Sequence, residues 1–314
     1  MAPSIEKAFD LLQAEGELPP TSLRGLSDMN SVAAEEARRQ WSRLPLSRRQ
    51  AVMRLAGSLA AEHIELNFDR LDLIGLQDPD PLVRRQAVAN LWESEEPSLR
   101  SRFLRLLETD ADLGVRVEAA RALGRFVLEM EETEADGGDR RRLEEALLSA
   151  TSDSDETLRL QAVEALGFSS RAEVPDLIRA AYDSAGDDAR RSALVAMGRS
   201  GDRRWRDIVT SELRSPAPTT RREAARAAGE LELRRSVPEL AELLEDASPE
   251  VALQAIWALG QIGGKSAERA LLRAQRTASD ESTRVALQES LENLTFLEGI
   301  RDLEGALRLR RESE

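Results

Sequence analysis

The stretch LRLQAVEALG, residues 158–167, decides the fold because variants of it recur along the chain. The pattern is a basic residue, two variable positions, an alanine, three more positions and an apolar residue, often followed by glycine. Residues at these spacings share one face of an α-helix. The clear copies read VRRQAVANLW at 83–92, VRVEAARALG at 115–124, ARRSALVAMG at 189–198, TRREAARAAG at 220–229 and VALQAIWALG at 251–260. Weaker copies are SRRQAVMRLA at 47–56 and TRVALQESLE at 283–292.

The copies follow a regular period. Successive register positions, where the basic residue stands, lie 36, 32, 43, 31, 31, 31 and 32 residues apart. Periods of this length are typical of repeat proteins whose units stack on one another. The long step contains an acidic insert at 129–140, which its glycine pair predicts to be a mobile loop. The register positions are Arg48, Arg84, Arg116, Arg159, Arg190, Arg221, Ala252 and Arg284.

Each unit contains two helical patterns. The motif is the second helix, and an amphipathic segment before it is the first, as in EVPDLIRAAY at 173–182. Short links such as QDPDP at 77–81 and EDASP at 245–249 carry turn residues and helix N-caps. Single alanines and glycines hold fixed places in the motif, which predicts close stacking of neighbouring helices. The sequence therefore predicts an all-α chain.

The pattern resembles HEAT repeats, especially the PBS-lyase-type HEAT-like, armadillo-type bacterial family. The resemblance lies in an aspartate six positions before the register arginine, as in Asp78 with Arg84, and it covers roughly 44–294. It implies an α-α superhelical solenoid of about seven to eight helix pairs. It also implies a ladder of aspartate–arginine contacts between repeats, formed by Asp78, Arg84, Asp110, Arg116, Asp153, Arg159, Arg190, Arg221 and Arg284.

Two departures from the family pattern predict a weak part of this ladder. Ser215 stands where an aspartate is expected, and Ala252 where an arginine is expected. We therefore expect the ladder to weaken or break between residues 215 and 252. The chain outside the repeats predicts an N-terminal helical cap at 1–43 and a C-terminal helical cap or tail at 295–314.

A partner surface is predicted on the motif helices, which line the concave face in HEAT-like stacks. The exposed positions should be the two before the motif alanine and the second and sixth after it. Arginine and tryptophan on this strip favour a groove for an acidic, partly apolar peptide. The alternative is that the arginines pair with Glu223, Glu230 and neighbouring acids, and that an adjacent helix covers Trp257. The candidate partner-binding residues are Arg191, Arg199, Arg222, Arg226, Leu253 and Trp257.

Composition excludes several kinds of chemistry. The chain has no cysteine and one histidine, His63, so it offers no thiolate site, multi-histidine metal centre or recognisable catalytic constellation. Lysine and arginine number 44 against 58 aspartate and glutamate, and the net charge of −14 argues against nucleic-acid binding. The chain has no apolar run long enough for a membrane helix and no signal-peptide block at its start, which predicts a cytoplasmic protein.

These observations favour a non-catalytic, cofactor-free scaffold that binds a protein or peptide partner. One alternative is a phycobilin-lyase-like protein that binds a tetrapyrrole in a groove, as an enzyme or an accessory. Another is a nucleic-acid-binding protein similar to HEAT-like DNA glycosylases. Deoxyhypusine hydroxylase has HEAT-like repeats too, but its iron site uses histidine–glutamate pairs, and here His63 is followed by Ile64.

Overall fold

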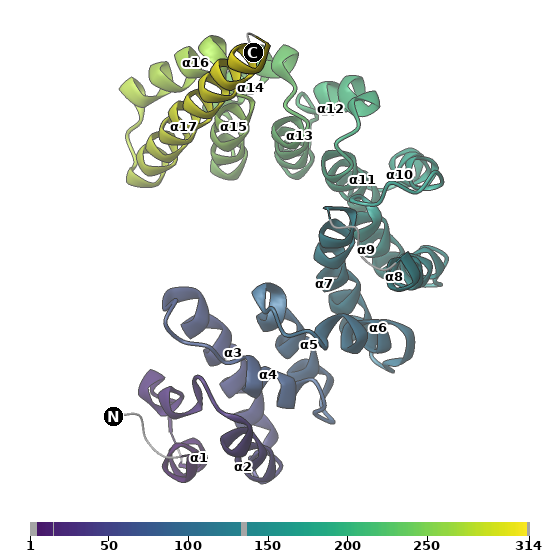
Figure 1. Cartoon of the computed structure of the whole chain (residues 1–314), viewed down its shortest axis with the longest axis vertical. Helices are drawn as coiled ribbons and strands as arrows, with labels where there is room; N and C mark the ends of the chain where they lie inside the picture. Colours follow the sequence, from purple (N-terminus) through teal and green to yellow (C-terminus); the bar gives the residue numbers. More distant parts are fainter. Residues whose placement is uncertain (1–4, 15, 133–136, 313–314) are drawn as a thin grey trace. The chain divides into compact units, whose positions relative to one another are not determined.

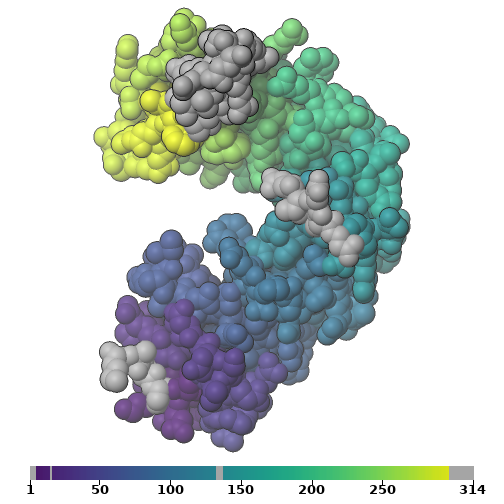
Figure 2. Space-filling view, viewed as in Figure 1, coloured from purple at the N-terminus to yellow at the C-terminus, as the bar shows by residue number. Residues whose placement is uncertain are grey.

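The computed structural model describes residues 5–14, 16–132 and 137–312, with side chains up to residue 296 except that of Glu132. Every regular element within these ranges is a helix, which confirms the predicted all-α solenoid fold. The chain forms two compact units, Met1–Ala165 and Leu166–Glu314. In each unit the repeats follow one another in chain order (Figures 1 and 2).

The N-terminal unit holds three short 3-10 turns and the first nine α-helices (Figure 1). The α-helices are α1 (Ile5–Gln13), α2 (Ser31–Trp41), α3 (Leu46–Glu62), α4 (Asp69–Gly75), α5 (Pro81–Asn90), α6 (Leu99–Thr109), α7 (Leu113–Glu132), α8 (Gly137–Ala150) and α9 (Glu156–Leu166). The turns are η1 (Pro20–Ser22), η2 (Arg24–Leu26) and η3 (Leu91–Glu93). The last residue of α9 belongs to the second unit.

The C-terminal unit repeats the same pairing of helices. Its α-helices are α10 (Val174–Asp183), α11 (Asp187–Arg199), α12 (Arg206–Glu212), α13 (Pro218–Glu230), α14 (Val237–Glu242), α15 (Pro249–Ile262), α16 (Gly264–Thr277) and α17 (Glu281–Glu312). The 3-10 turns are η4 (Arg203–Trp205), η5 (Arg234–Ser236) and η6 (Leu243–Glu245). Helix α17 runs without a break across residue 295, the first residue of the predicted C-terminal helical cap or tail.

The acidic insert does not form the predicted loop where the structure describes it. Helix α7 continues to Glu132, and α8 starts at Gly137, so the insert lengthens both helices. Ion pairs favour this helical arrangement, because Arg140 contacts both Glu131 and Glu144. The middle of the insert, 133–136, lies outside the described residues.

The motif helices, which we define as α3, α5, α7, α9, α11, α13, α15 and α17, pack side by side within each unit (Figure 1). The motif alanines have no exposed surface and form the centre of the core; these are Ala87, Ala119, Ala162, Ala193, Ala224 and Ala255. The motif glycines face the next motif helix. A Cβ atom added at Gly124, Gly167, Gly198 or Gly229 would lie 2.9–3.3 Å from the Cα atom of Ala165, Ala196, Ala227 or Ala258, respectively. Small side chains at both positions therefore set the short spacing between repeats.

Arg84 shows how the ladder joins two repeats. Its Nε and Nη2 atoms donate to both carboxylate oxygens of Asp110 in the next repeat, at 2.8 and 2.7 Å. Its Nη1 atom donates to the carbonyls of Asp78 and Pro79, which close its own inter-helix link. A planar guanidinium can make both sets of bonds at once. The Arg116–Asp153 contact is longer, at 3.9 Å, and Arg159 donates to the carbonyls of Asp153 and Ser154.

The ladder also has a first member that the sequence analysis did not include, one residue after the register position Arg48. Arg49, rather than Arg48, donates to the Leu44 carbonyl and pairs with Asp78 at 2.8 Å. Arg48 instead donates to the Ala14 carbonyl. The first motif copy is therefore shifted by one position, since its buried residues are Val52 and Met53 rather than Ala51.

Between residues 215 and 252 the ladder was expected to weaken or break, but its Arg221 bridge is intact. Arg221 still donates to the Ser215 and Pro216 carbonyls and bridges to Asp246 through two bonds of 2.7 and 2.8 Å. The hydrogen bond from Arg221 lowers the pKa of Asp246. Sequence reasoning missed Asp246 because it precedes Ala252, the register position without an arginine. At the next step of the ladder both partners are replaced: Ala252 stands in place of the arginine, and Ala278 in place of the aspartate that it would contact. No carboxylate there is therefore left without its partner.

Arg190, which would face an aspartate at position 215, finds another carboxylate. Its Nε atom lies 3.9 Å from Glu212 Oε1, and its guanidinium lies 5.7 Å from the centre of the Tyr182 ring. The Tyr182 hydroxyl donates to Glu212 at 2.6 Å. Tyr182 and Glu212 thus replace the missing aspartate, with looser geometry.

This cluster predicts an unusual titration of Tyr182, the only tyrosine of the chain. Burial, together with the hydrogen bond and negative charge of Glu212, raises the pKa of Tyr182 to about 12. Its contribution to stability is fully present below the unfolded-state pKa near 10 and is lost as pH rises through about 12. Absorbance at the tyrosinate band should show this midpoint in the native protein and the ordinary one in denaturant. The Glu212→Gln variant should titrate lower, and an unchanged midpoint in that variant would contradict the assignment.

Candidate protein-binding surfaces

Three of the four candidate arginines of the predicted strip pair with acids of their own helices. Arg191 pairs with Asp188 at 2.7 Å, Arg222 with Glu223 at 2.6 Å and Arg226 with Glu230 at 2.9 Å. The Arg199 guanidinium lies 5.1 Å from the centre of the Phe168 ring. These contacts agree with the alternative interpretation of the strip, in which internal acids neutralise the arginines. A partner would have to compete with them.

The exposed part of the motif helices is also narrower than expected. Glu118, Ser192, Val195 and Glu223 are buried, although the spacing rule placed them on the exposed strip. The reason is that a motif helix inside a stack has a neighbour on each side as well as its own first helix behind it. Three covered faces leave less surface than the single covered face of an ordinary amphipathic helix.

Apolar surface on α15 is only partly available. Leu253 is half-buried, and Trp257 keeps 37% of its surface exposed. The Trp257 ring lies on the backbone of Gly229, because a Cβ atom added there would be 2.7 Å from Trp257 Cζ3. The adjacent helix α13 therefore covers one face of the indole, as the alternative interpretation stated.

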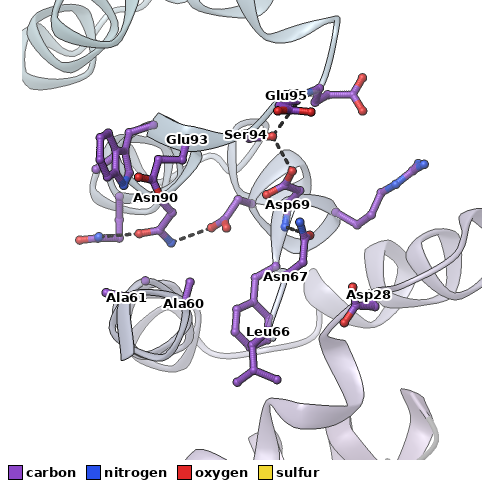
Figure 3. A pocket seen from close by; sticks show the side chains of 18 of the residues that line it. Asp28, Ala60, Ala61, Leu66, Asn67, Asp69, Asn90, Glu93, Ser94 and Glu95 are labelled. Atoms are coloured by element: carbon purple, nitrogen blue, oxygen red, sulfur yellow. Dashed lines mark hydrogen bonds between the residues drawn. The ribbon is translucent and has the colours of Figure 1, made fainter. Parts of the chain in front are cut away.

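A larger candidate site lies in the N-terminal unit, where sequence reasoning did not place one. Helix α3, the 64–68 link, α4, the end of α5 and the 92–97 segment surround a cavity of about 1420 Å³ (Figure 3). We call it the Trp92 pocket. Trp92 keeps 63% of its surface exposed, and Ile64 on the same lining is fully exposed. Large apolar side chains exposed beside a hollow are typical of binding sites.

A sequence signal for this pocket existed. Trp92 occupies the motif position that carries glycine at 124, 167, 198, 229 and 260. An indole cannot occupy the narrow space between two motif helices that glycine leaves, so it projects outwards. The spacing rule for the predicted strip selects Gln86 and Ala89 in this repeat, which do line the pocket, but it does not select position 92.

Polar side chains on the pocket wall form a hydrogen-bonded chain. Gln86 donates to Asn90 Oδ1 at 2.9 Å, and Asn90 Nδ2 donates to Asp72 at 2.7 Å and to the Met53 carbonyl at 3.0 Å (Figure 3). Nearby, the Ser94 hydroxyl donates to Asp69, whose backbone N–H donates to Asn67. These bonds hold the side chains in fixed positions, which suits a preformed binding site.

Asp72 is the buried acid in this series of hydrogen bonds. Its burial predicts that the stability of the protein depends on pH. Burial raises the pKa of Asp72 well above its ordinary value; the Asn90 hydrogen bond opposes this and the Asp69 charge adds to it. Its contribution to stability is thus present below the unfolded-state pKa of 3.8 and is lost as pH rises through the folded-state pKa. Asp72→Asn should therefore raise the urea midpoint at pH near 7, and the gain should disappear at low pH. A gain independent of pH would contradict this account.

Metal-ligating side chains and the histidine are dispersed in the described part of the chain. There, no group of three histidine, cysteine, aspartate or glutamate side chains is placed to hold a metal ion. The ring of His63 lies 3.6 Å from Glu65 at the exposed end of α3. Among the described helices, none is both long and apolar enough to span a membrane.

Comparisons with solved structures give several similar chains. The complex of CpcE and CpcF of phycocyanin lyase from Nostoc sp. PCC7120 matches at 20% identity over 72% of this chain and 94% of that chain, with a TM-score of 0.49. Escherichia coli YibA matches at 16% identity over 94% and 98% of the two chains, with a TM-score of 0.42. Human deoxyhypusine hydroxylase in complex with glycerol matches at 17% identity over 93% and 96%, with a TM-score of 0.38. No curated protein matches the chain.

The family model of HEAT repeats matches residues 72–136 and 206–292. These ranges contain α5 to α7 in the first unit and α12 to α16 in the second, where the helix pairs, buried alanines and arginine bridges described above recur. The sequence match and the repeated architecture therefore agree, and these two parts of the chain consist of HEAT repeats.

Proposed function

We propose that the chain is a non-catalytic scaffold that binds a segment of a partner protein at the Trp92 pocket. The observation that carries this proposal is the large exposed surface of Trp92 beside a hollow with fixed polar side chains. Tryptophan is enriched among the residues that dominate binding energy at protein interfaces. Stacked helical repeats are a scaffold that presents such surfaces without needing catalytic groups.

The strip on α11, α13 and α15 is a secondary place for a partner. Leu253 and Trp257 offer some apolar area, but the neighbouring arginines already have internal acid partners. Binding an acidic peptide there would exchange one ion pair for another, which gains little free energy at an exposed surface. The Trp92 pocket therefore supports partner binding better than the strip that the sequence favoured.

Affinity purification from the native host tests the proposal when variants are compared side by side. Trp92→Glu should lose the co-purifying protein that the unmodified chain captures. Val32→Glu is the matched control, since Val32 is an exposed apolar residue outside the pocket and the change adds the same charge. It should capture the partner as the unmodified chain does.

The other outcomes separate the competing functions. Capture that survives Trp92→Glu and is lost with Trp257→Glu would place the partner on the strip instead. Visible absorbance of the purified protein would favour a tetrapyrrole-binding role, and salt-sensitive retention on oligonucleotides would favour nucleic-acid binding. The absence of any specific polypeptide under all conditions would contradict the scaffold proposal.

A further inference from the structure

We infer that the Trp92 pocket takes a cationic protein segment that also carries an apolar side chain. The inference rests on the proposed function and names the chemistry of the partner. It is the opposite of the acidic peptide that the sequence favoured for the other unit. Charge, exposure and the geometry of the pocket each contribute to it.

The lining of the pocket is acidic. Six carboxyl side chains line it against two guanidiniums, Arg54 and Arg70. Even without the buried Asp72, five carboxyl groups remain against these two guanidiniums, so a positively charged group entering the hollow meets a net negative field. The six acids are Asp28, Asp69, Asp72, Glu93, Glu95 and Glu96.

Two of these acids are exposed and follow the exposed Trp92 closely in the sequence. Glu93 and Glu95 lie in the segment that follows Trp92 directly, and neither takes part in a described ion pair (Figure 3). They differ from Glu223 and Glu230 of the other unit, whose carboxylates face arginines of their own helix. A lysine or arginine of a partner would therefore pair with Glu93 and Glu95 without first displacing an internal cation.

The apolar part of the pocket supplies the second requirement. Trp92 and Ile64 are exposed, and Met29, Leu66 and Phe68 also line the hollow. An apolar partner side chain would be removed from water there, and a partner cation could stack on the indole face. Charge alone would attract many basic molecules, whereas charge with an apolar anchor selects a segment that has both.

The test measures binding of three labelled synthetic peptides to the full chain by fluorescence anisotropy. One peptide alternates lysine with leucine in a helical pattern, the second has glycine in place of leucine, and the third has glutamate in place of lysine. We expect the lysine–leucine peptide to bind most tightly and the glutamate–leucine peptide not to bind. Acrylamide quenching should show that the bound lysine–leucine peptide shields an exposed tryptophan, and Trp92→Phe should remove that shielding.

Two double variants test whether peptide binding depends on the carboxylates of the pocket or only on the net charge of the protein. The Glu93→Gln and Glu95→Gln double variant should raise the Kd of the lysine–leucine peptide about tenfold or more. Glu242→Gln with Glu245→Gln removes the same charge at exposed sites of the other unit and should leave Kd unchanged. Circular dichroism checks that all four substitutions leave the helices intact.

Two results would overturn the inference. One is equal weakening by both double variants, because the chain would then attract the peptide only through its net charge. The other is binding of the glutamate–leucine peptide as tight as that of the lysine–leucine peptide. The scaffold proposal fails separately: if Trp92→Glu still captures the host partner, the pocket is not its site whatever the peptides do. If capture is lost but no cationic peptide binds, the scaffold role stands and the partner chemistry inferred here is wrong.

Discussion

Replacing Asp78 with alanine should destabilise the N-terminal unit by about 3–5 kcal/mol, the range for removing one partner of a buried ion pair. The Asp78 side chain is fully buried and lies 2.8 Å from the Arg49 guanidinium, itself only 13% exposed. It also accepts from Trp41 Nε1 at 2.7 Å and from the Asp80 backbone N–H at 2.9 Å. Alanine would leave a buried guanidinium and a buried indole N–H without this acceptor.

Urea unfolding, followed by circular dichroism and tryptophan fluorescence, measures this loss. The control is Glu36→Ala, which removes the carboxylate of an exposed pair with Arg39. Because solvent screens that pair, the control should leave the midpoint almost unchanged. Asp78→Asn should fall between the two, since an amide oxygen can still accept from Trp41. If Asp78→Ala and Glu36→Ala had equal midpoints, the buried carboxylate would not be the anchor described above.

The second large effect is expected at Gly167. A Cβ atom there would lie 2.9 Å from the Cα atom and 3.0 Å from the carbonyl oxygen of Ala196. Both are backbone atoms of the neighbouring motif helix, so neither can rotate away as a flexible side chain would. Gly167→Ala should therefore destabilise the C-terminal unit by about 1–3 kcal/mol, the usual cost of overpacking.

Replacing glycine by alanine inside a helix ordinarily stabilises the protein, whereas we expect a loss of stability at Gly167. A control glycine without a close neighbour separates the two effects. Gly137 starts α8, and a Cβ atom added there meets no atom within 4 Å. Gly137→Ala should be neutral or stabilise by up to about 1 kcal/mol, because alanine is the better helix former. Thermal unfolding of the two variants gives both values. Stabilisation by Gly167→Ala would mean that the repeats are spaced more widely than described.

The period of the sequence was enough to predict the stacked helix pairs. Motif spacing identifies the buried face of a helix, and single small residues identify where neighbours approach. Links such as QDPDP also carry enough local chemistry to fix a turn, since Asp80 accepts from the N–H of Val83 as an N-cap. These features depend on residues close together in the chain, which is why they could be predicted.

The candidate sites were harder to predict because they depend on which of several available partners a side chain takes. Arg222 could have faced solvent or Glu223, and only the three-dimensional arrangement shows that it pairs with Glu223. The buried position of Glu223 itself follows from a second neighbouring helix, which a single-helix pattern cannot reveal. Glu212 takes the place of an aspartate at position 215, although it lies three residues earlier. A search that looks for an acid only at position 215 cannot find it.

Successive repeats contact one another through the same pair of small residues, a glycine of one motif helix and an alanine of the next. Gly167 meets Ala196, Gly198 meets Ala227, and these glycines and these alanines are each 31 residues apart. If one whole period were removed between them, Gly167 would face Ala227, an alanine like the one it lost. Growth or shortening by complete units therefore preserves this contact. The same small residues that keep neighbouring helices close thus favour changes of chain length by whole repeats.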